Sequence, residues 1–399
     1  MMNNVQEAER IVSIDILRGF SILGIFLVNM PAFHTPMLYI NPLSWWDKNP
    51  DRILYILTDI FAQASFYPLF SFLFGFGAIL LAERINQRGQ SFPLLFSRRM
   101  LALLLFGCIH AFLIWHGDIL INYALFGFIF ILFYKLSGKL LLILGALIYL
   151  IPFLMLAMLT IAAQTFGMDG LEIPTDQEAV RQSLEVYQNG TFIEIMYQRF
   201  NDWYSVNNLV SAIILFLSIF PLFLLGTGFA KLRLLERPDV YRTHLRIIMA
   251  VSLVLGLLFK LIPYLTANNY ATVFLQDTFG GPMLSLFYIT AITLLLQRNL
   301  IYKVMLPFSY IGRLSMSNYL FQSIIGTLIF YSYGLSFYGR VSFTTGLVLV
   351  GGIFVIQILA SKYWLKYFLM GPIEYVWRVF TYWRKPSIRR IKHGKGGQH

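Results

Sequence analysis

A short polar stretch between two very apolar segments holds the titratable residues best suited to chemistry. Within residues 108–127, the side chains of His110, Trp115, Asp118 and Tyr123 interrupt a run of Ile, Leu, Phe and Ala. Titratable and polar groups at membrane depth are costly and usually face the protein interior, so they count as candidates for a functional site. We therefore expect the rest of the chain to form a helical framework around this stretch.

The central pair of candidates is a histidine and an aspartate. The pKa of histidine lies near physiological pH, so His110 is suited to proton transfer or nucleophilic attack. Asp118 follows eight residues later, and Gly117 is expected to break the helix before it. If the chain folds back, Asp118 would orient His110 as the carboxylate partner of a base. Two plainer roles stay open: Asp118 as the N-cap of the next helix, and His110 in a hydrogen bond between helices. His116 is expected to be exposed in the turn.

The first apolar segment opens with an acidic and a basic residue. Asp15 and Arg18 are three positions apart, so on a helix they share one face and can pair. One interpretation is a topology anchor at the membrane edge. The other is that Arg18 binds a phosphate-bearing donor, because guanidinium matches phosphate bidentately. Asn29, further along, is expected to hydrogen-bond to another helix.

A second polar stripe lies near the C-terminal end of the chain and contains Arg313, Asn318 and Gln322. Such a stripe must face protein or water, so it either lines a cavity or joins helices by hydrogen bonds. Helix packing is also expected at Ser71 and Gly75, because small residues let helices approach closely. Lys260 is expected to extend to the outer interface.

Composition identifies the class of protein. The chain has 399 residues, of which 58% are hydrophobic and 13% charged, whereas soluble domains carry about 25% charged residues. An integral membrane protein is therefore predicted. The net charge of +12 is interpreted as a topology signal and not as nucleic-acid binding, since no nucleic-acid-binding fold accompanies it. No metal site is predicted, because the histidines lack ligand spacing and Cys108 is the single cysteine.

The predicted fold is an all-α, polytopic membrane helical bundle. A spanning helix needs about 20 apolar residues, and about ten such segments are found: 14–34, 61–82, 99–116, 118–136, 140–163, 208–230, 245–266, 281–297, 306–331 and 342–365. Lys and Arg concentrate in alternate connections, and the positive-inside rule then places both termini in the cytoplasm.

The whole chain, 1–399, is predicted to be a single membrane domain with two extramembrane segments. Residues 164–207 form the longest loop, placed on the extracytoplasmic side, and Glu178 to Tyr187 in it match a short amphipathic helix. This loop is interpreted as a solvated surface or as a lid over an outward-facing site. Residues 382–399 form a basic cytoplasmic tail, expected to lie on anionic lipid of the bilayer.

Five motifs in the expected order resemble the YeiB-like bacterial membrane proteins, the domain-of-unknown-function 418 family. They lie at residues 14–25, 72–77, 110–120, 312–322 and 371–378, so the resemblance covers nearly the whole chain. It implies a multi-pass protein of the bacterial plasma membrane. No reaction follows from it, because the family has none firmly assigned.

A more distant resemblance concerns the first helix. Asp15, Arg18 and the later Asn29 are similar to the start of transmembrane acyltransferases, including the heparan-glucosaminide acetyltransferases. This resemblance implies an acyl-CoA donor contacted by Arg18, no permanently bound cofactor, and a membrane-embedded histidine that passes the acyl group to a sugar. His34 matches the position of that histidine, whereas His110 matches the YeiB-like motif. We favour His110.

The leading hypothesis is a membrane acyltransferase that moves an acyl group to an envelope or extracytoplasmic acceptor. His110 and Asp118 would carry the chemistry. Arg18 and Arg313 would hold an anionic donor. The full set of expected substrate-binding residues is Arg18, Asp15, Asn29, Trp115, Tyr123, Arg313, Asn318 and Gln322. The alternative is a transporter or exporter of a small solute with His110 as proton relay, and a third class is a non-catalytic scaffold or sensor.

Overall fold

The structure is a computed structural model that describes residues 11–166 and 173–390. Part of the predicted 164–207 loop and half of the basic tail, residues 391–399, lie outside the described residues. Within the described ranges the chain is helical, and its β-structure is limited to an isolated bridge between Phe368 and Arg389. The all-α prediction is confirmed.

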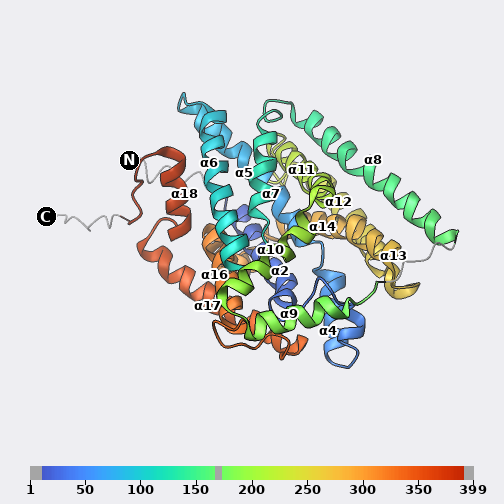
Figure 1. Cartoon of the computed structure of the whole chain (residues 1–399). Helices are drawn as coiled ribbons and strands as arrows, with labels where there is room; N and C mark the ends of the chain where they lie inside the picture. The colour runs from blue at the N-terminus through green and yellow to red at the C-terminus, as the bar shows by residue number, and fades with distance from the viewer. Residues whose placement is uncertain (1–10, 167–172, 391–399) are drawn as a thin grey trace.

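Eight helical stretches in the described ranges are long and apolar enough to cross a membrane. A helix satisfies all its backbone polar groups internally, which is the requirement for spanning lipid. The stretches, visible in Figure 1, are α2 (Val12–His34), α4 with α5 (Asp51–Phe61, Phe66–Gln87), α6 with the π-helical turn η1 (Phe92–Ile109, His110–Ile114), α8 (Gly138–Thr165), α11 (Leu209–Lys231), α12 (Arg242–Leu265), α13 with η2 and α14 (Tyr270–Leu275, Gln276–Gly280, Gly281–Leu295) and α17 (Phe343–Tyr367).

Two of the ten predicted segments differ from the helices found. The segment 118–136 contains only α7 (Leu120–Phe130), whose 11 residues rise about 16 Å, roughly half of a bilayer core. The segment 306–331 is divided between α15 (Asn299–Arg313) and α16 (Ser315–Phe330), because the backbone leaves the helical conformation at Leu314. Both stretches remain apolar, so hydropathy does not reveal where the chain changes direction.

The bundle is held together by glycines at backbone crossings. A Cβ at Gly75 of α5 would overlap the carbonyl oxygen of Phe223 on α11, and a Cβ at Gly226 of α11 would overlap that of Phe72. Thr227 donates a hydrogen bond to the Gly75 carbonyl at 3.0 Å. The predicted close packing at Gly75 is therefore confirmed, and α5 and α11 meet backbone to backbone.

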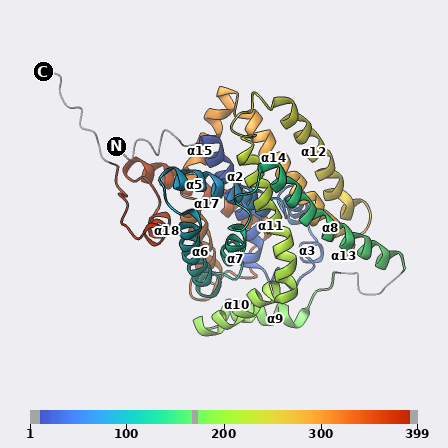
Figure 2. The same cartoon turned by 90° about the horizontal axis from the view of Figure 1, so that it is seen from above.

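Two helices from the long loop cover one end of the bundle. These are α9 (Gln177–Asn189) and α10 (Phe192–Asn207), which lie together in Figure 2. The α9 helix confirms the predicted amphipathic helix around 178–187. Asp176 caps α9 by accepting from the Ala179 amide at 3.0 Å, and Thr191 with Glu194 forms a capping box at the start of α10. The α10 helix packs on η1, the turn that begins with His110.

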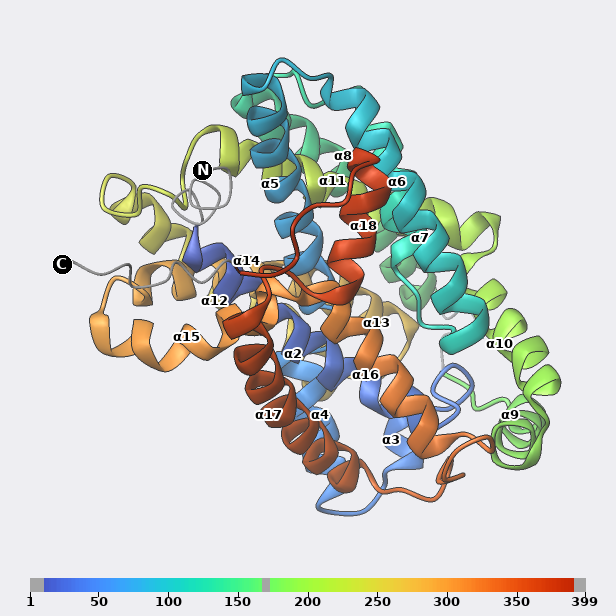
Figure 3. The same cartoon turned by 90° about the vertical axis from the view of Figure 1, so that its left-hand side faces the viewer.

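The C-terminal helices complete the framework around α16. In Figure 3, α16 and α17 run beside one another and α18 (Pro372–Tyr382) lies against α6. The Trp377 indole of α18 donates to the Arg99 carbonyl of α6 at 2.8 Å, and its ring stacks under the Arg99 guanidinium at 3.6 Å. The short helix α3 (Pro42–Trp45) lies beside α9, since its Trp45 borders the same hollow as α9 side chains, and α4 lies near α9 in Figure 1.

Candidate functional site

His110 lies at the centre of a three-residue hydrogen-bonded relay. Its Nδ1 atom is 2.9 Å from Oδ1 of Asp118, and its Nε2 atom is 2.8 Å from Oγ of Ser323 on α16. The other carboxylate oxygen, Oδ2, accepts from the Ile121 amide at 2.8 Å. The chain does fold back as the sequence hypothesis required, and Asp118 both orients His110 and satisfies the first turn of α7.

The chemistry of these partners determines the imidazole tautomer. A carboxylate accepts hydrogen bonds only, so Nδ1 of His110 carries the hydrogen and donates it to Asp118. In the neutral ring Nε2 then has a free lone pair, which accepts the hydroxyl hydrogen of Ser323. A hydroxyl, an imidazole and a carboxylate in this order match the arrangement of nucleophile, general base and orienting acid found in Ser-His-Asp enzymes.

The relay is completely enclosed by protein. The side chains of His110 and Asp118 have no exposed surface, and Ser323 is equally buried. The ring of Tyr319 lies 5.0 Å from the imidazole, and its hydroxyl donates to the Gly117 carbonyl at 3.1 Å. The indole of Trp115 lies 6.3 Å from the same imidazole. Aromatic rings therefore separate the relay from lipid and water.

Local backbone structure explains how the relay forms. His110 begins the π-helical turn η1, whose wider winding ends at Ile114. Such turns often occur at functional sites because they change the direction of side chains in an otherwise regular helix. Residues 115–119 then turn back without helical structure, which brings Asp118 beside His110. Gly117 leaves room for the Trp115 ring, which a Cβ there would overlap.

Ser323 was not among the residues predicted from sequence. It is 213 positions from His110 and sits in an apolar helix where serine commonly bonds to its own backbone. Its weak alternative acceptor is the Tyr319 carbonyl at 3.5 Å. The one sequence feature near it was the polar stripe ending at Gln322, the preceding residue.

The stripe itself serves to join helices. Gln322 donates to the Gln357 side chain at 2.9 Å, and Gln357 donates to the Asn318 carbonyl at 3.0 Å. Asn318 also donates to Ser361 at 3.1 Å. These groups are buried between α16 and α17, on a different side of α16 from Ser323. Of the two alternatives for the stripe, the structure places Asn318 and Gln322 in interhelical hydrogen bonds.

Two further predicted residues lie near the relay but form no hydrogen bond with it. The Tyr123 hydroxyl is 2.6 Å from the Ser71 hydroxyl, so it connects α7 to α5. Trp115 is buried with its ring 4.2 Å from Phe33, and its indole nitrogen has no hydrogen-bond partner.

Asn29 is half-buried and forms no side-chain hydrogen bond to any other described residue, contrary to the interhelical bond predicted for it.

The predicted donor-binding arginines gather at the start of α2. Arg18 pairs with Asp15 at 3.6 Å, as the spacing predicted. A Cβ at Gly312 would overlap the Asp15 carbonyl, so the neighbouring Arg313 lies beside the same turn. Arg99 of α6 interacts electrostatically with both Arg18 and Arg378. Several guanidinium groups from different helices therefore share one region.

Two expectations about exposure were wrong. His116 is buried under α10, with Nδ1 3.7 Å from Oδ2 of Asp202, and burial lowers the pKa of its imidazole. Lys260 does not extend to an interface: it is fully buried, pairs with Asp277 at 3.1 Å and donates to the Gln63 carbonyl at 2.7 Å. In both cases a carboxylate from a distant segment compensates the burial.

The N-terminus of α16 is held by a carboxylate from α18. Glu374 accepts from the amides of Met316 and Ser317 at 2.9 and 3.1 Å and from the Ser317 hydroxyl at 2.5 Å. Negative charge is favourable at a helix N-terminus. Even so, burial is the largest influence and raises the pKa of Glu374 above its ordinary value of 4.5.

This raised pKa predicts how stability depends on pH. The folded chain binds the Glu374 proton more tightly than the unfolded chain, so stability should fall as pH rises from about 4.5 through the raised pKa. Glu374→Gln keeps an acceptor for the amides and should remove this component. Unfolding temperatures of both proteins between pH 4.5 and 7 check the prediction; parallel curves would contradict it.

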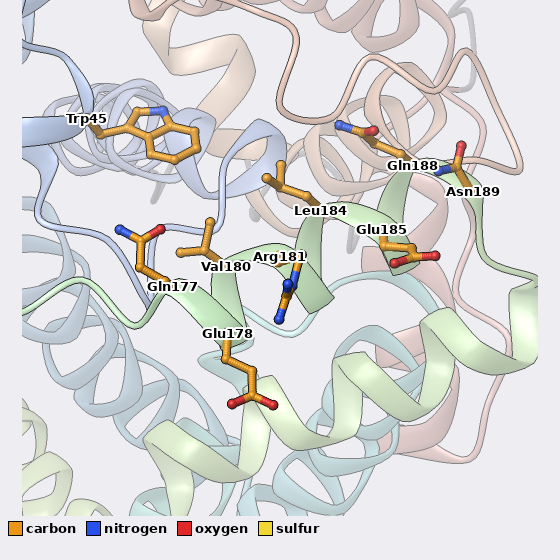
Figure 4. A pocket seen from close by; sticks show the side chains of 9 residues that line it. All are labelled: Trp45, Gln177, Glu178, Val180, Arg181, Leu184, Glu185, Gln188 and Asn189. Carbon is orange, nitrogen blue, oxygen red and sulfur yellow. The ribbon is translucent and has the colours of Figure 1, made fainter.

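A surface hollow lies on the covering helices, away from the relay. It has a volume of about 790 Å³ and is bordered by Trp45 and by α9 side chains that include Gln177, Arg181 and Gln188. Figure 4 shows Trp45 at one end and the α9 side chains along the other. None of the relay residues borders it.

Among residues 11–166 and 173–390, no three His, Cys, Asp or Glu side chains are grouped to hold a metal ion.

Fold and site together define a polytopic α-helical membrane protein with a buried carboxylate–imidazole–hydroxyl relay. Residues 229–384 match the family described as "Protein of unknown function (DUF418)". Similarity extends over nearly the full chain: the uncharacterized protein YxaH of Bacillus subtilis is 38% identical, covering 96% of this chain and 97% of the relative. The chain therefore belongs to the DUF418 family, as predicted.

Two other relatives have comparable coverage. The uncharacterized protein YeiB of Escherichia coli is 28% identical over 94% of this chain and 96% of its own length. An uncharacterized 39.9 kDa protein of Bacillus acidopullulyticus is 31% identical over 97% of this chain and 98% of its own length. The relatives thus match nearly the whole chain, and their names state no reaction.

Proposed function

We propose that this protein is a membrane-embedded acyltransferase in which Ser323, His110 and Asp118 act as nucleophile, general base and orienting acid. The observation that carries the proposal is the pair of hydrogen bonds on the two imidazole nitrogens, 2.9 Å to Asp118 and 2.8 Å to Ser323. Deprotonation by an oriented base is the general means of activating a serine. Burial of the group strengthens each of these hydrogen bonds.

The proposed reaction has two balanced steps. In the first, Ser323 Oγ attacks the carbonyl carbon of an acyl thioester while its proton moves to Nε2 of His110. The C–S bond breaks, the thiolate takes that proton, and an acyl-serine remains. In the second, an acceptor hydroxyl gives its proton to His110, attacks the acyl carbon and forms a new ester, and Ser323 recovers the proton. Asp118 stays ionised throughout and stabilises the imidazolium that forms.

The arginine region provides a place for an acyl-CoA donor. Arg313 lies just before the start of α16, and Arg99 interacts electrostatically with Glu374, which caps α16, and with Arg18 and Arg378. Guanidinium groups suit phosphate oxygens. Ser323 follows eight residues after Ser315, the first residue of α16, which is about 12 Å along a helix. In this proposal the arginines hold the phosphates on the cytoplasmic side of a bacterial plasma membrane. The acyl chain then extends along α16, and the acceptor comes from the envelope side.

Enclosure of the relay sets a condition on the mechanism. With Tyr319 bonded to the Gly117 carbonyl and Trp115 packed on Phe33, the thioester reaches Ser323 only when these rings move apart. The Trp115 indole nitrogen lacks a partner, so its displacement breaks no hydrogen bond. Exclusion of water also protects an acyl-serine from hydrolysis.

The test is acyl capture by the purified full chain in detergent with [¹⁴C]acetyl-CoA, followed by denaturation and peptide mass spectrometry. We expect label on Ser323 that resists hydroxylamine at neutral pH and is released at alkaline pH, because oxygen esters are more stable than acyl-imidazoles. If the label is instead on His110 and is lost in hydroxylamine at neutral pH, the histidine and not the serine carries the acyl group. Absence of label, together with proton-coupled solute uptake in liposomes, would favour the alternative function of a transporter.

A further inference from the structure

A buried arginine on the covering helix α10 has no counter-ion. Arg199 is fully buried, and no carboxylate oxygen of the described residues lies within 4.0 Å of its nitrogens. Its carboxylate neighbour Asp202 instead accepts from Tyr39 at 2.7 Å, Tyr187 at 2.6 Å and Gln198 at 2.8 Å. A buried charge without a partner is strongly unfavourable, so the arrangement calls for an anion.

The neutral contacts of Arg199 leave part of its hydrogen-bonding capacity unused. Nη1 donates to the Phe112 carbonyl and Nη2 to the Tyr333 hydroxyl, both at 3.2 Å. The aromatic rings of Phe192 and Tyr331 lie 6.0 and 5.8 Å from the guanidinium carbon. Nε has no partner, although buried polar atoms are hydrogen-bonded in about nine cases of ten.

A second unused donor lies one turn further along the same helix. Trp203 is four residues after Arg199, so the two side chains share a face of α10, and the indole nitrogen of Trp203 is also buried without a partner. Both side chains contact the same residue of η1: Arg199 bonds the Phe112 carbonyl, and the Trp203 ring lies 5.1 Å from the Phe112 ring. A cation and a neutral donor thus occur together beside the turn that begins with His110.

We propose that Arg199 and Trp203 bind an oxyanion, a carboxylate or phosphate group carried by the acceptor substrate. The guanidinium supplies the charge and the free Nε–H, and the indole supplies a second N–H, which together suit the oxygens of one anionic group. That the bound anion belongs to an acceptor substrate rests on the proposed acyl transfer. Binding of the anion itself does not depend on that proposal. It specifies an acidic acceptor, such as a hydroxylated acid or a phosphorylated sugar.

Entry to this site is through partly exposed aromatic residues. Phe192 is 46% exposed and Tyr333 is half-buried, and both contact the guanidinium. His116 interacts electrostatically with both Arg199 and His110, so an anion held by Arg199 lies in the same region as the relay. An acceptor hydroxyl on the same molecule could then reach His110 once the relay opens.

The experiment is isothermal titration of the purified full chain in detergent with inorganic phosphate and, separately, with glucuronate. Potassium chloride at equal ionic strength is the blank. We expect saturable binding of at least one probe, and Arg199→Gln should weaken it roughly 10- to 100-fold, the range for a charged hydrogen bond in a buried site. Trp203→Phe should weaken it by a smaller factor. Arg181→Gln, an exposed arginine on α9, is the matched control and should bind like wild type.

The outcomes separate this site from the acyl-transfer proposal. Ser323→Ala should bind the probes with unchanged affinity, so an anion site that depends on Arg199 stands even if no acyl transfer is found. If the heats measured with phosphate and with glucuronate both equal the heat of the chloride blank, the proposal is overturned. Water would then be the partner of the Arg199 and Trp203 donors. If Arg199→Gln fails to fold, Arg199→Lys and Trp203→Phe decide. Wild-type affinity in both would also overturn the proposal.

Discussion

Replacement of Ser323 by alanine is expected to reduce acyl transfer on the order of 10⁶-fold, the loss typical when the nucleophile of a hydroxyl–imidazole–carboxylate set is removed. The reason is that no other hydroxyl of the described residues is hydrogen-bonded to Nε2 of His110. His110→Ala should cost about as much, and the double variant little more, because residues that act as a unit are not additive. The rate of [¹⁴C]acetyl transfer by purified protein is the measurement.

Thr327→Ala provides the matched control on the same helix. Thr327 lies one turn beyond Ser323, is equally buried, and bonds only to its own helix at Ile324, so its replacement should leave the rate within a few-fold of wild type. Unfolding temperatures of all variants must accompany the rates. If Ser323→Ala and His110→Ala keep wild-type rates while folding normally, the relay is only a structural connection between α16 and η1.

The second large effect is expected on folding and comes from a single methyl group. Gly75→Ala places a Cβ on the carbonyl oxygen of Phe223, where α5 and α11 touch backbone to backbone. A flexible side chain could move aside, but a backbone carbonyl cannot, so the two helices must separate. We expect a loss of about 3 kcal/mol, the upper end for an overpacked core. The unfolding temperature and the yield of monodisperse protein in size-exclusion chromatography should both drop.

Gly351 on α17 is the control for this effect. It also lies inside a helix, but a Cβ there meets nothing within 4 Å. Since alanine favours a helix over glycine by about 1 kcal/mol, Gly351→Ala should be neutral or stabilising. Equal behaviour of the two variants would show that the backbones of α5 and α11 are not in contact at Gly75.

The class of protein and most of its helices follow from the order of the amino acids alone. Hydropathy is a local property, so apolar runs of sufficient length identify spanning segments wherever the chain goes next. Local spacing also placed Asp15 beside Arg18, and the helix-breaking Gly117 correctly anticipated the turn that brings Asp118 back to His110. The prediction of spanning helices from hydropathy failed where the chain bends within apolar sequence, at the short α7 and at Leu314.

Which polar groups meet depends instead on how the helices pack in three dimensions. In the sequence, Ser323 is an isolated serine in an apolar helix. Its contact with His110, 213 residues away, arises only when the helices pack. The same packing turned Asn318 and Gln322 toward α17, and it buried His116 and Lys260 beside the distant carboxylates of Asp202 and Asp277. A polar side chain in a membrane helix needs a partner, and composition reveals that need. Which residue supplies the partner depends on how the helices are rotated and crossed, because that arrangement minimises unpaired polar groups over the whole bundle at once.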